Sequence, residues 1–154
     1  MSWDAFGAMG ELVGALAVLA SLIYLARQIR HSMESNRISN YHEAQQQLWS
    51  AAEIIAGDAV LSAEIGKSLN KGLDQVSPES LVRVEFIMAS FFFGMENMLS
   101  LYEKGQIDVE QWQNVFDNNY RFIGSALGHD VITQRPGAIS GRLKKLIDDR
   151  SGVS

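Results

Sequence analysis

The feature that most constrains this chain is an apolar run near its start. Residues 5–26 have the sequence AFGAMGELVGALAVLASLIYLA, and Glu11 is the only charged residue among these 22. At about 1.5 Å per residue, a helix of this length crosses a hydrocarbon core of roughly 30 Å. Trp3 and Tyr24 bracket the run, and such rings anchor helices at the two membrane interfaces. The run therefore predicts a single transmembrane helix over residues 5–26.

Two other roles for an apolar segment fit this run less well. A secretory signal peptide carries positive charge before its apolar core, whereas residues 1–4, MSWD, are acidic. A core helix of a soluble protein seldom stays uncharged on every side for the 15 residues from Leu12 to Ala26. A membrane span is the favoured interpretation.

Three arginines set the expected orientation of that span. Arg27, Arg30 and Arg37 follow the apolar run, and positive residues beside a span tend to stay in the cytoplasm. On a helix they lie within roughly 80° of one another, so they also form a basic face suited to lipid headgroups. We expect residues 1–4 to form a short outer tail and the rest of the chain to be cytoplasmic.

Small residues within the apolar run form one stripe. They recur at spacings of 3, 4, 3 and 4, which keeps them on one side of a helix: Gly7, Gly10, Gly14, Ala17 and Ser21. Small side chains let membrane helices approach closely, so the stripe predicts packing against a second copy or another membrane protein. Glu11 borders the stripe. It either reaches the outer headgroups or, if it lies in the hydrocarbon, is protonated, paired or facing water.

The remainder of the chain predicts a helical domain. Neither Gly nor Pro occurs from residue 27 to 56, so the span is expected to continue as a juxtamembrane helix over residues 27–57. Residues 58–150 hold about four further helical stretches and no alternating β pattern, and residues 151–154 form a tail. The predicted fold class is all-α: a transmembrane helix that continues into a long cytoplasmic helix, packed with a small helical bundle.

Several local signals predict the helices of this domain. Residues 86–95, FIMASFFFGM, are apolar on all sides, as is typical of a central helix. Ser77 begins that helix, with its side chain expected to accept a backbone hydrogen bond, and Asp108 begins the next one, which is expected to run to residue 127. Residues 128–140 predict a loop, followed by a last amphipathic helix.

Few side chains in this sequence are able to carry chemistry. Cysteine is absent and the three histidines show no metal-binding spacing, so neither a metal nor a cofactor is expected. The net charge of −5 opposes the binding of nucleic acid. Glu96 follows the most apolar stretch of the domain and is the best candidate acid or base. A structural role is favoured, in which it pairs with Arg83, Arg121 or another cation or points to water from the helix edge. No catalytic residue is therefore assigned.

Two runs of this chain resemble a known group of proteins. One is the membrane exit YLARQIR, from Tyr24 to Arg30, and the other lies at 96–112 with Glu96, Tyr102, Gly105, Ile107, Asp108 and Trp112. Together they resemble a widespread family of small, uncharacterised bacterial proteins with one N-terminal transmembrane helix. The chain departs from that pattern at 129–140, where an aromatic-rich segment is replaced by HDVITQRPGAIS. The resemblance implies a membrane-anchored helical protein of the bacterial inner membrane, without a known activity.

Three functional classes follow from these features. The favoured class is a non-enzymatic membrane-anchored interaction or scaffold protein, whose partners are the lipid bilayer and a second copy or another membrane protein. A pore-forming or transport accessory oligomer is the alternative, motivated by Glu11 within the span. An enzyme at the membrane surface, using Glu96 or His42, is the third, and a pocket with convergent polar groups would support it.

Overall fold

The structure is a computed structural model that describes residues 3–152, with side chains from Gly7 onward except Ala8. It divides into two compact units, one ending at Ser39 and one beginning at Asn40. The described residues form these helices, with η1 a short 3-10 turn: α1 (Trp3–Ala56), α2 (Ala59–Ser68), η1 (Leu73–Gln75), α3 (Pro78–Glu103), α4 (Val109–Ile123), α5 (Ala126–Gln134) and α6 (Gly141–Ser151).

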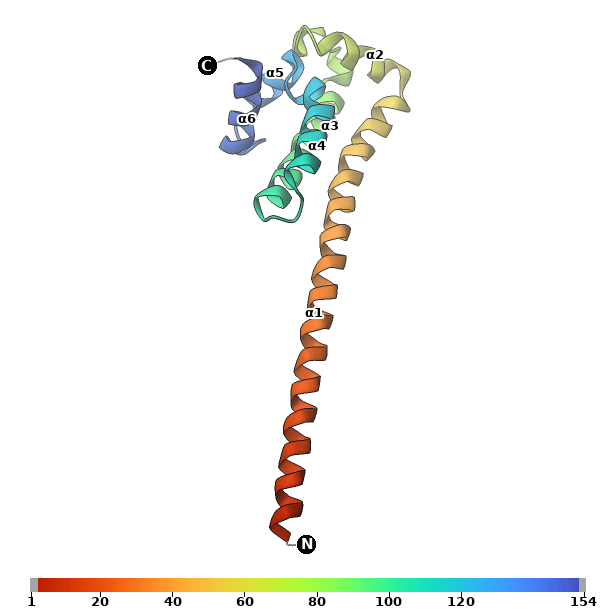
Figure 1. The fold of residues 1–154 in the computed structure, drawn as a ribbon. Coiled ribbons are helices and arrows are strands. Elements are labelled where there is room, and N and C mark those ends of the chain that lie inside the picture. Colours follow the sequence, from red (N-terminus) through yellow and green to blue (C-terminus); the bar gives the residue numbers. More distant parts are fainter. Residues whose placement is uncertain (1–2, 153–154) are drawn as a thin grey trace. The chain divides into compact units, whose positions relative to one another are not determined.

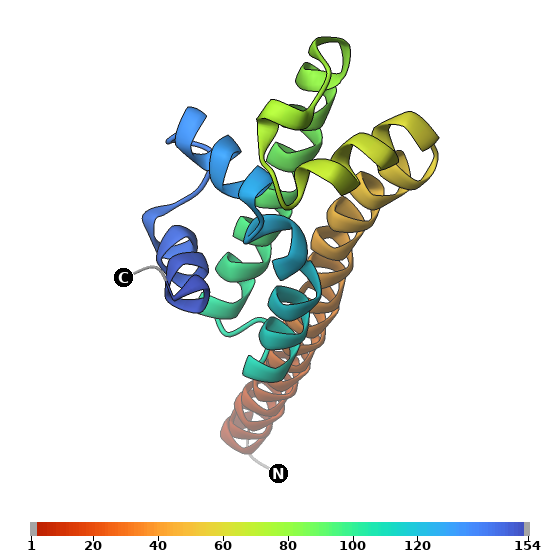
Figure 2. The ribbon, with the colours of Figure 1, turned by 90° about the horizontal axis from the view of Figure 1, so that it is seen from above.

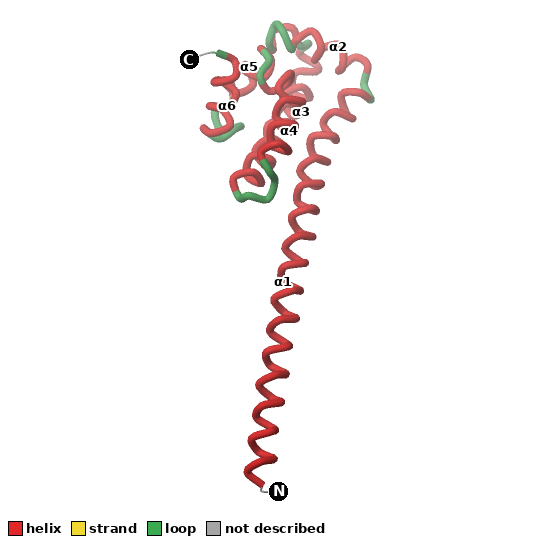
Figure 3. Tube along the Cα trace, viewed as in Figure 1, coloured by secondary structure: helices red, strands yellow, loops and turns green. Residues whose placement is uncertain are grey.

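The all-α prediction is confirmed, because residues 3–152 contain helices and connecting loops and no strand (Figure 3). Five α-helices follow the long one, against about four expected. α1 runs without a break for 54 residues and ends beside Gly57, where the sequence predicts its end. Asp58 then begins α2 by accepting hydrogen bonds from the backbone N–H groups of Val60 and Leu61.

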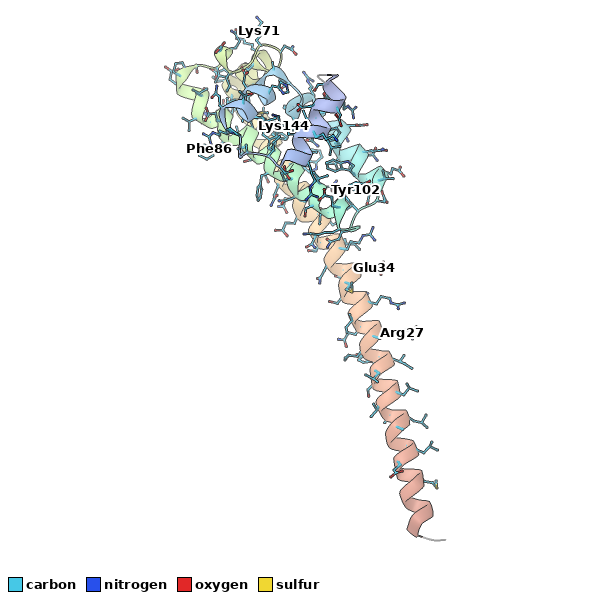
Figure 4. All side chains as sticks on the ribbon, turned by 90° about the vertical axis from the view of Figure 1, so that its left-hand side faces the viewer. Arg27, Glu34, Lys71, Phe86, Tyr102 and Lys144 are labelled. Atoms are coloured by element: carbon cyan, nitrogen blue, oxygen red, sulfur yellow. The ribbon has the colours of Figure 1, made fainter. Side chains whose placement is uncertain are left out.

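The part of α1 in the first unit is a helix whose described side chains are not buried by any other element. Every described side chain from Gly7 to Ser39 is exposed, including the large apolar ones. Figure 4 shows side chains extending to both sides of this ribbon, with Arg27 and Glu34 labelled. By length and composition this helix can cross a membrane. α3 is also long and apolar enough to cross a membrane, but more than half of its most apolar stretch is buried inside the protein.

In the second unit, α3 is the central helix, as its sequence predicts. Figures 1 and 2 show α4 running back along α3, with α5 and α6 nearby. The most deeply buried positions of α3 are fully shielded from water: Val84, Met88, Phe92, Met95 and Met98. Phe91 stacks on Phe122 of α4 with ring centroids 4.9 Å apart, which joins these two helices through an aromatic pair.

The last turns of α1 pack against α3 at a glycine. Ala44, Leu48 and Ala51 of α1 are buried, and Leu48 lies over Gly94 of α3. A Cβ atom added at Gly94 would lie 2.7 Å from Leu48 Cδ2, closer than two carbon atoms can approach. Asn97 strengthens the same contact by donating a hydrogen bond of 2.7 Å to Gln47 Oε1. Gly94 is therefore required by packing, since it lies within regular helix.

Two local predictions are wrong. The helix expected to run to residue 127 ends at Ile123, and α5 occupies most of the predicted loop. Ser125 begins α5 by accepting a hydrogen bond from the N–H of Gly128, and Leu127, Val131 and Ile132 bury its inner face. Residues of low helix propensity separate those apolar residues, so the sequence did not indicate a helix there.

The start of α3 also differs from its prediction. Ser77 occupies the N-cap position, followed by Pro78, but its side chain accepts no backbone hydrogen bond there. Ser77 and Ser80 instead lie beside the carboxylate of Glu64 on α2 and lower its pKa. The carboxylate thus lies beside the positive end of the α3 dipole, where a negative charge is favourable.

We predict that Gly94→Ala destabilises the chain by about 1–3 kcal/mol, because the added methyl group forces Leu48 away from α3. Chemical denaturation of the full chain in detergent micelles, followed by circular dichroism, measures the change. Gly66→Ala is the matched control. Gly66 is exposed on α2 with nothing within 4 Å of its Cβ position, so the substitution should raise stability by roughly 0.5–1 kcal/mol. Equal effects at the two sites would contradict the packing argument.

Candidate membrane anchor and interaction surfaces

The small residues predicted to form a stripe all lie on α1. The Cβ positions of Gly7, Gly10 and Gly14 have no neighbouring atom within 4 Å. The hydroxyl of Ser21 donates a hydrogen bond of 2.8 Å to the carbonyl oxygen of Ala17, so the polar group is satisfied within its own helix. The surface of this stripe is therefore open, and its one hydroxyl needs no external partner.

Large apolar side chains cover the rest of the run. Each of these exposes more than half of its surface: Leu12, Val13, Leu16, Val18, Leu19, Leu22, Ile23 and Leu25. Exposing apolar area to water costs about 25 cal/mol per Å². A hydrocarbon environment removes that cost without requiring any partner protein. This continuous apolar surface is the strongest physical indication of a membrane segment in the chain.

The predicted interface and topology residues lie along the same helix. Trp3 is the first residue of α1, and its side chain is outside the described residues. Tyr24 is exposed, as are Arg27, Arg30 and Arg37 one to four turns further on. Glu11 is exposed among apolar neighbours.

Glu96, the candidate acid or base, makes a structural hydrogen bond. It is half-buried on α3, and its Oε1 accepts a hydrogen bond from the backbone N–H of Ser140, the residue that caps α6. Glu103, two turns further along α3, forms an ion pair with Arg142 on α6. The two carboxylates join α6 to α3, so the partner of Glu96 in this bond is a backbone N–H and not a cation.

Other carboxylates join elements in the same way. Asp58 of the α1–α2 connection accepts a hydrogen bond of 2.8 Å from Arg83 on α3. Asp130 of α5 accepts one of 2.8 Å from the backbone N–H of Leu73, at the start of η1. The preceding residue, Gly72, has φ of +84°, and a Cβ atom there would collide with that carboxylate. These acids therefore fix where one element meets another.

The described residues hold no group of three or more metal-ligand side chains. His31, His42 and His129 are exposed. No histidine, nucleophile and acid converge among the hydrogen bonds and ion pairs described above.

An open groove on the helical domain is the feature that the sequence did not predict. It has a volume of about 750 Å³ and lies over α3, bordered by Gln47 to Ile54 of α1 and by the loop at 135–138. Phe86 and Phe93 of α3 occupy it with 62% and 61% of their surface exposed. Figure 4 shows the labelled Phe86 pointing away from the helix. Residues 86–95 are thus central to the fold but are not buried on every side.

A pattern in the sequence does mark this surface. Phe86 and Phe93 are seven residues apart, which places them on the same side of a helix. The apolar sequence of residues 86–95 predicts a central helix but does not show which of its sides another element covers. The groove contains one charged side chain, Arg135, which is paired with Glu85 and lies 5.8 Å from the centroid of the Phe86 ring. The described residues that line it include no acid and no histidine, and the other polar side chains among them are Gln47, Ser50 and Ser90.

Comparison of the chain with protein-family models, with curated proteins and with solved structures finds no match. The resemblance of the membrane-exit run to a bacterial family therefore stays a prediction. The functional argument depends on the surfaces described above.

We predict that acid destabilises the domain through its capping carboxylates. The backbone N–H of Leu61 and the Arg83 side chain lower the pKa of Asp58 below its ordinary value of 3.8. The Ser80 and Ser77 hydroxyls lower the pKa of Glu64 below 4.5. Folded carboxylates with lowered pKa values bind fewer protons than unfolded ones. Their stabilisation is thus complete above the unfolded pKa and is lost as pH falls through the folded pKa.

The melting temperature of the full chain in detergent should therefore be level from neutral pH to about pH 5 and fall below it. Asp58→Asn should lower the melting temperature at neutral pH and weaken the acid dependence. Glu53→Gln removes an exposed carboxyl of α1 and serves as the control. An Asp58→Asn variant whose acid dependence equals that of the wild type would refute this role.

Proposed function

We propose that this protein is a membrane-anchored, non-enzymatic scaffold that holds a small helical domain at the cytoplasmic face of a bacterial inner membrane. The observation that carries the proposal is the apolar surface of α1, exposed over the whole of residues 9–26. In water this surface is costly, whereas in a bilayer it is favourable. Anchoring accounts for this surface without a partner protein.

The proposed orientation follows from charge. Arg27, Arg30 and Arg37 are exposed on the side of the run toward the helical domain. Positive residues next to a span favour the cytoplasm, so the domain is cytoplasmic and the N-terminus is outside. Their guanidinium groups also suit the anionic headgroups of the inner leaflet.

The proposed scaffold self-associates through its membrane helix. The open stripe from Gly7 to Ser21 allows close approach of a second copy, and close packing is the main attraction available between helices in lipid. The satisfied hydroxyl of Ser21 permits this approach without leaving an unpaired polar group.

The helical domain supports a binding role over a catalytic one. Glu96 and Asp130 are used in hydrogen bonds that position α6 and η1. The groove over α3 is apolar and lacks the converging acids and bases that proton transfer requires.

A pore-forming or transport accessory oligomer is the second candidate function. Glu11 favours it, because an exposed carboxyl within an apolar run can face water inside an oligomer. Conductance across reconstituted bilayers distinguishes this candidate, since a scaffold produces none.

Orientation can be tested because the chain contains no cysteine. In intact cells whose outer membrane has been permeabilised, an impermeant maleimide should label Ser2→Cys. It should label Lys144→Cys, at an exposed position of α6, only after the inner membrane is opened. The reverse labelling pattern would show the opposite orientation. If neither site is labelled before the inner membrane is opened, both ends of the chain lie inside.

Self-association through the stripe predicts that Gly14→Leu separates the helices. The larger side chain removes the close contacts, so the oligomer in mild detergent should shift to smaller species by light scattering. Leu22→Ile is the control, because it changes an exposed side chain off the stripe without changing its volume. A wild-type chain that is monomeric both in detergent and in bilayers would remove this part of the proposal.

A further inference from the structure

The exposed apolar surface over α3 forms one contiguous patch. Val82, Phe86 and Phe93 of α3 fall within roughly 40° of one another on the helix, and Ile54 of α1 borders the same groove. Each of these four side chains exposes more than half of its surface. We call this set the α3 patch.

The size of the α3 patch is sufficient for an interaction surface. With roughly 200 Å² for a fully exposed aromatic side chain, the two phenylalanines present about 250 Å², and the whole patch presents roughly 400–500 Å². A patch of this size is as large as the largest one on a typical monomeric protein, roughly 300–600 Å², and such patches are often functional. Two copies joined through this patch would bury about 1,000 Å² with its edges included, the lower limit for a specific interface.

The shape of the patch suits a second copy of itself. Phe86 and Phe93 form a ridge along α3. Small residues line the groove beside this ridge: Ala51 of α1, Ala89 and Ser90 of α3, and Gly137 and Ala138 of the loop. A ridge beside a trough is self-complementary, because the ridge of each copy fits the trough of the other across a two-fold axis.

The charges at the edge of the patch permit this pairing. Arg135 is bound by Glu85 and Arg83 by Asp58, each within one chain. Two identical patches therefore meet without bringing unneutralised arginines together. A strongly acidic partner, in contrast, would have to displace both of these ion pairs.

We propose that the α3 patch is a second self-association surface, in which two copies pair with a two-fold axis parallel to α3 and to residues 40–56 of α1. The choice of axis rests on the proposed function. If both copies are anchored in one membrane, the N-terminal parts of both chains must extend from the interface in the same direction. A parallel axis keeps both chains running in the same direction at Asn40. It also brings Ser90, near the middle of the patch, close to Ser90 of the other copy.

Cysteine crosslinking of the full chain in proteoliposomes with a large excess of lipid tests this arrangement. With a short bis-maleimide, Ser90→Cys should give about tenfold more crosslinked dimer than Ser62→Cys, an exposed position on α2 away from the patch. Adding Phe93→Glu should reduce the Ser90→Cys yield to the level of Ser62→Cys. Adding Val60→Glu should leave it unchanged, because Val60 is equally exposed but lies on α2.

Three results would overturn the proposal. One is an equal yield from Ser90→Cys and Ser62→Cys, and another is a Ser90→Cys yield that Phe93→Glu does not change while the helical circular dichroism is intact. The third is protection of Ser90→Cys from a monofunctional maleimide without dimer formation, which would mean that lipid or another molecule covers the patch.

Separate readouts distinguish this surface from the proposed function. Sedimentation of the chain with the lipid after a carbonate wash tests membrane anchoring alone. Gly14→Leu in the Ser90→Cys background reports the stripe in the membrane helix. A crosslink that survives Gly14→Leu supports the α3 patch even if the stripe does not associate, and loss of sedimentation would exclude the anchor whatever the crosslink shows.

Discussion

The helical domain is organised around the need to cover one helix. α3 is apolar on nearly every side, so each face left in water carries a cost that only another element can remove. Residues 44–51 of α1 cover one face at Gly94, α4 covers another through Phe122, and α2, α5 and α6 also contact α3. The groove over Phe86 and Phe93 is the face that this chain leaves without a cover. The same requirement accounts for both the fold and its most unusual surface.

Acidic side chains then determine where the covering elements begin. Asp58, Glu64, Glu96 and Asp130 each place a carboxylate at the first turn of a helix, and three of them do so from a different element. Backbone N–H groups at a helix start lack partners and carry partial positive charge, so a carboxylate satisfies both needs. The acidic balance of the chain is thus in part a structural property of its connections.

Much of this architecture could be predicted from the sequence. The apolar run, the unbroken stretch to Ala56 and the capping Asp108 are signals carried by neighbouring residues, and the helices follow them. α5 escaped prediction because its buried residues are separated by weak helix formers, so it depends on tertiary contacts. The Ser140 partner of Glu96 lies 44 residues away, a separation that no local pattern reveals. The exposure of Phe93 likewise depends on which elements fail to reach it.

The elements that cover α3 are far apart in the sequence, and this separation affects the order in which their contacts form during synthesis. Residues 40–56 of α1 leave the ribosome first, yet Leu48 has no surface to pack on until Gly94 has been made. The backbone N–H of Leu73 donates a hydrogen bond to Asp130, which is synthesised 57 residues later, and Asn40 hydrogen-bonds Gln106 across 66 residues. Contacts this distant form late, after their loop-closure entropy has been overcome. The domain therefore stays open until most of the chain has been made, and the nascent α3 is the segment that most needs shielding from aggregation in that interval.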